Sequence, residues 1–119
     1  MRDIATQSET ERRKVSRHTF QAAAVVTEAG SSRIIVAPTS ELGRFGCFVQ
    51  AASTFPQGTR IHIVMTNEGA TFEATATVSH VTEEGMGIVF ITVEAADQEI
   101  LEKWLADERR KPIIPLQRF

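Results

Sequence analysis

Basic side chains gather near the start of the chain, where Arg12-Arg13-Lys14 is followed by Arg17. The guanidinium group of arginine is a planar fork of donors that holds a phosphate or a guanine edge at two points and can stack on a ring. Arg13 and Arg17 are four residues apart, so together they could clamp a nucleotide against the domain that follows. The alternative is a solvated leader, because most runs of like charge are simply solvated.

Residue types that support catalysis or metal binding are scattered along the rest of the chain. The three histidines, His18, His62 and His80, are far apart, and Cys47 is the single cysteine. Cys47 lies in an apolar stretch, which favours a buried structural thiol over a nucleophile. The sequence has no spacing typical of a nucleophile–base pair, a metal-ligand set or a phosphate-cradling glycine loop. We therefore expect no enzymatic activity, no catalytic residue, no metal and no cofactor.

The composition is that of one ordinary globular domain. The chain has 119 residues, of which 42% are hydrophobic and 24% charged, and its formal net charge is −2. This near-neutral balance argues against a protein that coats DNA or RNA. No apolar run is long enough to span a bilayer, and the first residues lack the apolar core of a secretory signal. We expect a cytoplasmic protein without membrane insertion.

Six short segments are rich in β-branched residues or alternate in polarity, and most of them end near glycine or proline, which predicts strands. They cover residues 20–26, 33–37, 46–50, 59–65, 71–81 and 87–93. Pro38 restricts pairing of the second strand to an edge or a bulge. Short strands at this spacing predict a sandwich or a closed barrel.

A helical pattern and an apolar tail follow the strands. Residues 95–108 carry one apolar stripe that should cap an open end of the barrel, formed by Ile100, Leu101, Trp104 and Leu105. We divide the chain into a disordered arm (1–11), a domain (12–110) and a tail (111–119). The apolar residues of the tail suggest that it docks on this chain or on another.

Three motifs occur in order along the chain: Arg13-Lys14-Val15-Ser16-Arg17, Glu41-Leu42-Gly43-Arg44-Phe45-Gly46 and Gly85-Met86-Gly87. In this order the sequence resembles the PilZ domain family of bacterial cyclic di-GMP receptors over nearly its whole length. That family opens with Arg-x-x-x-Arg, continues with Asp or Asn-x-Ser-x-x-Gly, and often begins its last strand with Gly-Met-Gly before an acidic helix. The resemblance implies an all-β fold with a C-terminal helix, built as a six-stranded antiparallel β-barrel.

The resemblance also implies a ligand site. In the family the arginines hold guanines and phosphates, and the second motif completes a guanine pocket. Carried over, the ligand-binding residues are Arg12, Arg13, Arg17, Glu41, Gly43 and Gly46. Glu41 replaces Asp or Asn and is one methylene longer, and Gly43 replaces Ser. The missing hydroxyl removes a hydrogen bond worth on the order of 0.5–1.5 kcal/mol. Ser40 is near this motif but out of register, so it receives no role.

The leading interpretation is a small cytoplasmic receptor that binds cyclic di-GMP, orders its N-terminal arm (residues 1–18) and contacts an effector protein. The alternative is a PilZ-like protein-interaction module that has lost nucleotide binding. The departures at Glu41 and Gly43 keep that alternative open, whereas the intact arginines favour the receptor.

Overall fold

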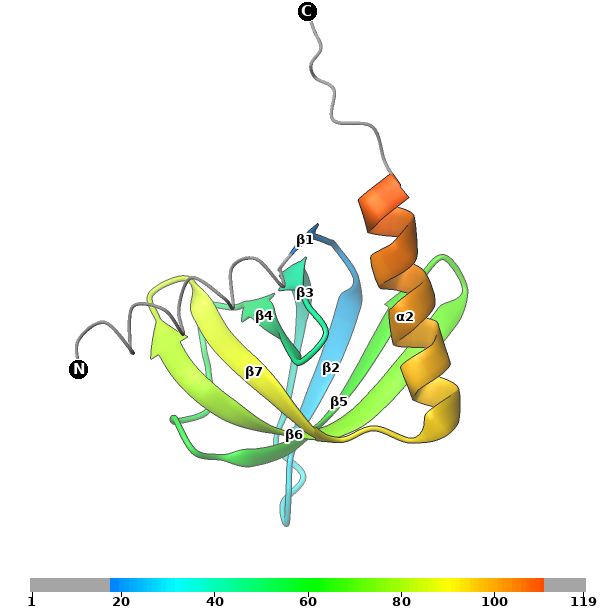
Figure 1. The fold of residues 1–119 in the computed structure, drawn as a ribbon. Coiled ribbons are helices and arrows are strands. Elements are labelled where there is room, and N and C mark those ends of the chain that lie inside the picture. Colours follow the sequence, from blue (N-terminus) through cyan, green and yellow to red (C-terminus); the bar gives the residue numbers. More distant parts are fainter. Residues whose placement is uncertain (1–17, 111–119) are drawn as a thin grey trace, which may run out of the picture.

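The structure is a computed structural model that describes residues 18–110. It is a closed six-stranded antiparallel β-barrel with one short extra strand and a C-terminal helix (Figure 1). The elements in chain order are β1 (His18–Thr19), β2 (Ala23–Glu28), β3 (Ile34–Leu42), β4 (Gly46–Gln50), β5 (Arg60–Asn67), β6 (Ala70–Thr82), β7 (Gly85–Thr92) and α2 (Ala95–Arg110). The sheet order is β1-β3-β2-β5-β6-β7-β4, and pairing of β3 with β4 closes the barrel. The fold predicted from the sequence is confirmed.

The barrel interior follows the alternation visible in the sequence. On β5 the side chains of Ile61, Ile63 and Met65 are buried, and those between them face outward. On the paired strand β6 the buried residues are Phe72, Ala74, Ala76 and Val78. Successive side chains of a strand point to opposite faces, so one apolar face from each strand fills the core.

The first strand begins later than the sequence predicts. Segment 20–26 is not one strand, because β2 starts at Ala23 and only His18 and Thr19 form β1. Thr39 explains the interruption: its buried hydroxyl donates to the carbonyl of Phe20 (2.8 Å) and accepts from the N–H of Ala22 (3.0 Å). A side chain therefore replaces part of the backbone ladder at this point.

The second strand is longer than predicted and changes partners along its length. Residues Ile34 to Pro38 of β3 pair with β2, and from Thr39 onward β3 pairs with β4. The ladder with β4 shifts between Thr39 and Glu41, so Ser40 is the extra residue of a β-bulge. The sequence predicted that Pro38 would lie at a sheet edge or a bulge. This agrees with its position just before β3 changes partner from β2 to β4.

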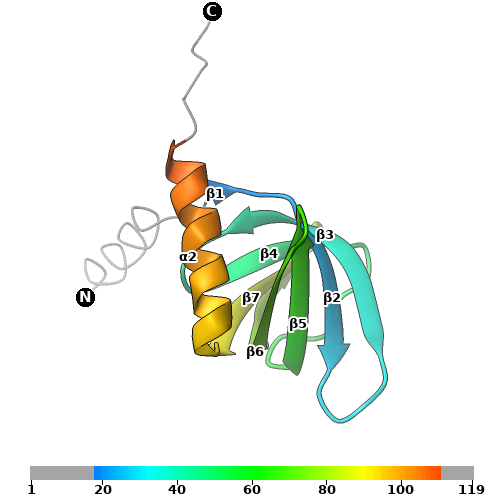
Figure 2. The same cartoon turned by 90° about the vertical axis from the view of Figure 1, so that its right-hand side faces the viewer.

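Helix α2 lies against one side of the barrel, as Figure 2 shows. Its apolar stripe is buried as predicted, and Leu101 and Leu105 join the core. The ring centroid of Trp104 lies 5.1 Å from that of Phe20 and 6.3 Å from that of Phe72. The carboxylate of Asp97 accepts a hydrogen bond from the backbone of β6 (2.9 Å). Within residues 18–110, no helix has the length and apolar character needed to cross a membrane.

Candidate functional site

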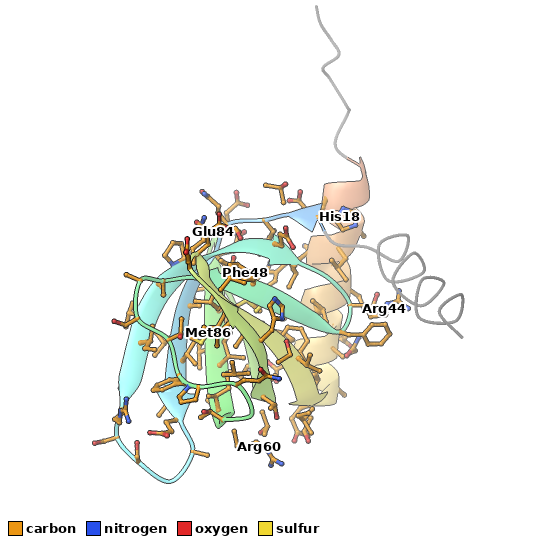
Figure 3. The ribbon with its side chains drawn as sticks, turned by 90° about the vertical axis from the view of Figure 1, so that its left-hand side faces the viewer. His18, Arg44, Phe48, Arg60, Glu84 and Met86 are labelled. Carbon is orange, nitrogen blue, oxygen red and sulfur yellow. The ribbon has the colours of Figure 1, made fainter. Side chains whose placement is uncertain are left out.

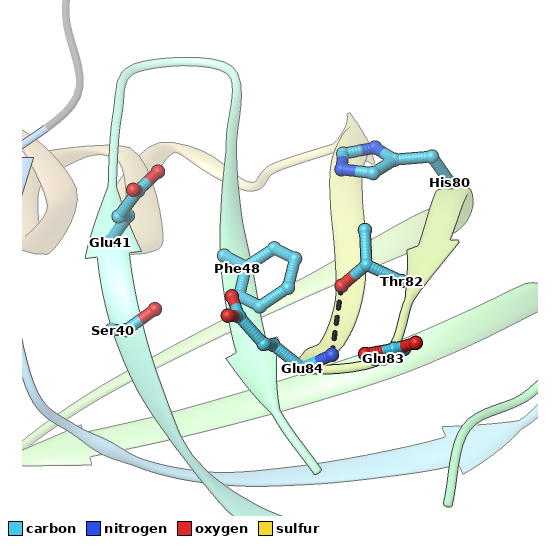
Figure 4. Close-up of a pocket in the computed structure, with 7 residues that line it drawn as sticks. All are labelled: Ser40, Glu41, Phe48, His80, Thr82, Glu83 and Glu84. Atoms are coloured by element: carbon cyan, nitrogen blue, oxygen red, sulfur yellow. Dashed lines mark hydrogen bonds between the residues drawn. The ribbon is translucent and has the colours of Figure 1, made fainter. Parts of the chain in front are cut away.

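A shallow hollow lies on the outside of the barrel, between the bulged part of β3 and the β6–β7 turn (Figure 4). Its volume is about 540 Å³, and it is lined by Ser40, Glu41, Phe48, His80, Thr82, Glu83 and Glu84. Three different strands and one turn therefore contribute to it. The turn is held locally, because the N–H of Glu84 donates to the hydroxyl of Thr82 (3.0 Å).

Two β-bulges shape this hollow. In a regular strand Glu41 would share the inward face with buried Thr39, but the bulge at Ser40 turns both Ser40 and Glu41 toward the hollow. On β6 the register with β7 shifts between Val78 and His80, which likewise turns His80 out of the core. Bulges that re-aim side chains are typical of functional sites.

Two rings form the aromatic part of the hollow. Phe48 and His80 lie with their ring centroids 6.1 Å apart and their planes tilted by 36°. The Nδ1 atom of His80 is 3.1 Å from the hydroxyl of Ser79. The imidazole ring lies across Gly87, where a Cβ atom would overlap it. The second glycine of Gly-Met-Gly thus makes room for a side chain of the hollow.

The glycines of the second motif have different structural roles. A Cβ atom on Gly46 would overlap the backbone carbonyl of Ile88, so Gly46 permits the close approach of β4 and β7. The N–H of Gly43 donates to the carbonyl of Gly46 (2.9 Å), which closes the turn between β3 and β4. Arg44 in this turn extends toward α2 (Figure 3), where its Nη2 atom is 3.7 Å from a carboxylate oxygen of Glu102.

The charge of the hollow is negative. Three carboxylates line it, from Glu41, Glu83 and Glu84, and among its described lining residues only His80 can carry a positive charge. In the described part of the chain, no group of three His, Cys, Asp or Glu side chains is arranged to hold a metal ion. Cys47 lies in the core beneath this surface, where burial raises the pKa of its thiol from 9.0 to about 12.

The structure brings the second-motif residue Glu41 into the hollow, together with Ser40 from just before the motif. The predicted arginines, Arg12, Arg13 and Arg17, lie outside the described residues, so their position stays a prediction. The two residues that follow their segment, His18 and Thr19, are nevertheless placed by strand pairing. His18 pairs with Leu42, and Thr19 pairs with Glu41. Arg17 therefore comes one residue before a strand that runs beside Glu41. Because His18 already belongs to the barrel, the expected arm can extend no further than residue 17.

Ser40, Phe48 and His80 are site residues to which the sequence assigned no role in the site. Phe48 comes two residues after the second motif, and it is the one aromatic residue of β4. Ser40 and His80 reach the hollow only because of the two bulges, and a bulge has no clear signature in a single strand. His80 is exposed in the structure, and its ring contacts Phe48 and lies across Gly87.

Comparison with known proteins agrees with this geometry. The PilZ domain family model matches residues 11–107. Among solved structures, the fold is similar to that of the Bacillus subtilis inhibitor of motility, MotI/DgrA, with a TM-score of 0.69 and 18% sequence identity. That match covers 85% of this chain and 53% of that chain, so this chain spans about half the length of the matched protein. No curated protein matches the sequence.

The closed barrel and its C-terminal helix are those of a PilZ-type domain, a class of receptor and adaptor domains. The chain belongs to the PilZ domain family.

Proposed function

We propose that the chain is a cytoplasmic cyclic di-GMP receptor whose nucleotide binds between the arginine segment and the hollow. The pairing of β1 with β3 carries this proposal. It places Arg17 two residues before Thr19, which pairs with Glu41 of the hollow. Six residues from Arg12 to Arg17 span about 20 Å at full extension, so every arginine of the segment is within reach of a ligand seated there.

The residues of the site have complementary chemistry for this nucleotide. The arginine forks bind phosphate oxygens and guanine edges. The carboxylate of Glu41 accepts from the N1–H and exocyclic amine of guanine. The rings of Phe48 and His80 offer apolar faces on which a base can stack. Ser40 supplies a further hydroxyl in the same hollow.

A signalling mechanism follows from the ligand's position between the arginine segment and the barrel. A nucleotide held by both the arginine segment and the barrel orders residues 1–17 against the hollow, and the newly ordered segment changes the surface offered to a partner. The output then depends on an effector protein that reads this surface.

Isothermal titration calorimetry with cyclic di-GMP tests the proposal directly. We expect binding by the native chain, and no measurable binding by Arg17→Ala at an unchanged melting temperature. Arg33→Ala is the matched control, because Arg33 lies on the β2–β3 hairpin with its side chain 68% exposed, and it should bind normally. Absence of binding by the native chain at millimolar nucleotide and low salt contradicts the receptor.

A second candidate function is a protein-interaction module without nucleotide. The negative charge of the hollow favours it, because the carboxylates of Glu83 and Glu84 repel phosphate and attract basic peptide segments. In this case Glu83→Lys and Glu84→Lys would abolish binding of the partner, whereas loss of the arginines would leave it intact.

A further inference from the structure

One outer face of the barrel is apolar, although it is exposed. Outward side chains of three neighbouring strands form it, and we call it the β3–β2–β5 face: Ala23, Val25, Ile34, Val36, Pro38 and Val64. Val25 pairs with Val36 on one side and with Val64 on the other, so the three valines form a row across the strands. Val36 is 70% exposed and Ile34 56%.

The next outer face is different. Outward residues of β5 and β6 around it are mostly polar: Arg60, His62, Thr66, Thr71, Glu73, Thr75 and Thr77. The Nε2 atom of His62 also lies 3.3 Å from a carboxylate oxygen of Glu73 there. A contiguous exposed apolar face of this kind marks an interaction site.

This face borders an open strand edge. The first five residues of β3 pair with β2 on one side only, because β4 joins β3 from Thr39 onward. The N–H of Thr39 donates to Ala22 and the carbonyl of Arg33 accepts from Glu28, so odd-numbered residues of β3 bond to β2. By the alternation of an antiparallel ladder, the backbone groups of Ile34 and Val36 point to the open edge. Pro38 offers only its carbonyl there.

The C-terminal tail has the complementary pattern. Its sequence Pro112-Ile113-Ile114-Pro115-Leu116 follows α2 and lies beyond residue 107, where the match to the PilZ family ends. Ile114 and Leu116 are two residues apart, so in an extended tail both present backbone N–H groups to the same edge. Pro112 has the same parity and lacks a donor.

We infer that the tail of a second copy of this chain adds as an antiparallel strand to the open edge of β3. The register places Leu116 opposite Ile34, Ile114 opposite Val36 and Pro112 opposite Pro38. The two prolines then face each other where neither can donate, and the apolar side chains extend the β3–β2–β5 face. Strand addition of this kind combines backbone hydrogen bonds with side-chain specificity.

The chain's own tail is too short for this register. The tail leaves α2 after Arg110. In Figure 2, α2 and the exposed run of β3 lie on different sides of the barrel. Pro112 is two positions after Arg110, and these two steps span at most about 7 Å. Exchange of tails between two copies resolves this, and it forms a closed symmetric dimer.

Site-specific disulfide formation tests the register on the full chain with its native thiol removed by Cys47→Ala. A chain carrying Val36→Cys is mixed with one carrying Ile114→Cys under mild oxidation. The Cα atoms of directly opposed residues in a hydrogen-bonded antiparallel pair are about 5.5 Å apart, which suits a disulfide. We expect a covalent dimer of the two chains. Ile113→Cys, whose side chain would point to the other face, is the matched control and should cross-link at least about tenfold more slowly.

Sedimentation velocity provides the second readout. The native chain should dimerise, and Val36→Asp should weaken the dimer at least about tenfold, because one apolar contact is replaced by a charge. Ile91→Asp is the control, since Ile91 is 53% exposed on β7, away from this edge. A native chain that stays monomeric at millimolar concentration overturns the inference. Equal weakening by both substitutions, or a disulfide formed only within one chain that carries both cysteines, also overturns it. None of these outcomes depends on nucleotide binding.

Discussion

The two glycines of Gly85-Met86-Gly87 should respond very differently to the same substitution. A Cβ atom on Gly87 would overlap the ring of His80, the movable end of a side chain. A Cβ atom on Gly85 would overlap the backbone carbonyl of Val49, and Gly85 also has a φ of 155°, which L side chains rarely adopt. The first clash is relieved by rotating one ring, whereas the second requires two paired strands to move.

The magnitudes follow from the contacts that each change removes. In Gly87→Ala, displacement of the imidazole loses its contact with Phe48 and its hydrogen bond to Ser79, about 1–2 kcal/mol together. The gain in strand stability from replacing glycine offsets about 0.5–1 kcal/mol of that loss. Gly85→Ala combines backbone strain with a strand shift, and we expect a loss of about 3 kcal/mol or more.

Thermal unfolding followed by circular dichroism measures both changes. One kcal/mol corresponds to about 4 °C in a domain of this size, so Gly87→Ala should lower the melting temperature by about 6 °C or less and Gly85→Ala by about 12 °C or more. The double variant His80→Ala/Gly87→Ala removes the clash and should be no less stable than His80→Ala alone. Equal losses for the two glycines, or no recovery in the double variant, would show that His80 does not occupy the position described.

Three further predictions concern the proposed ligand site and the core. Arg13→Ala and Arg17→Ala should each abolish cyclic di-GMP binding in calorimetry without lowering the melting temperature, and unfolding by either would contradict the separation of arm and barrel. Gly43→Ser and Glu41→Asp should each tighten binding by up to about tenfold, since one hydrogen bond is worth about 1 kcal/mol. A positive φ would strain a new side chain, but Gly43 is not among the described residues with a positive φ. Weaker binding at unchanged stability would contradict the carried-over pocket. The raised pKa of Cys47 should make the free energy of unfolding fall as pH rises from 9 to about 12, because the unfolded thiol loses its proton first. Denaturant titrations at several pH values measure the free energy of unfolding against pH. Between pH 9 and about 12 this free energy should fall more steeply in the native chain than in Cys47→Ala, by up to about 1.4 kcal/mol per pH unit. Equal pH dependence of the two chains would contradict the burial of Cys47.

The elements that the sequence predicts well are those governed by local periodicity. The alternation of Ile61, Ile63 and Met65 fixed which face of β5 is buried, and the spacing of Leu101 and Trp104 did the same for α2. These patterns depend on the residue's own strand or helix, so one sequence is enough to read them.

The elements that the sequence misplaces are governed by contacts between distant segments. The start of β2 depends on the hydroxyl of Thr39, which is 17 residues away from Ala22. The orientations of Glu41 and His80 depend on bulges that exist only relative to a paired strand. Simple alternation would place both side chains inside the barrel. The site was therefore only partly predictable, because its motif residues are visible in the sequence but the bulged residues that complete it are not.

The hollow and the arginine segment are complementary in charge, and under the proposed function this couples binding to ordering of the segment. The carboxylates of Glu41, Glu83 and Glu84 surround the hollow, so the barrel alone repels a phosphate diester. The positive charges of Arg12, Arg13 and Arg17 enter the chain just before β1, which is anchored beside Glu41. A nucleotide can then be held only when the segment and the barrel close on it together. The position of the segment, rather than any change in the barrel, is therefore the signal that a partner protein would read.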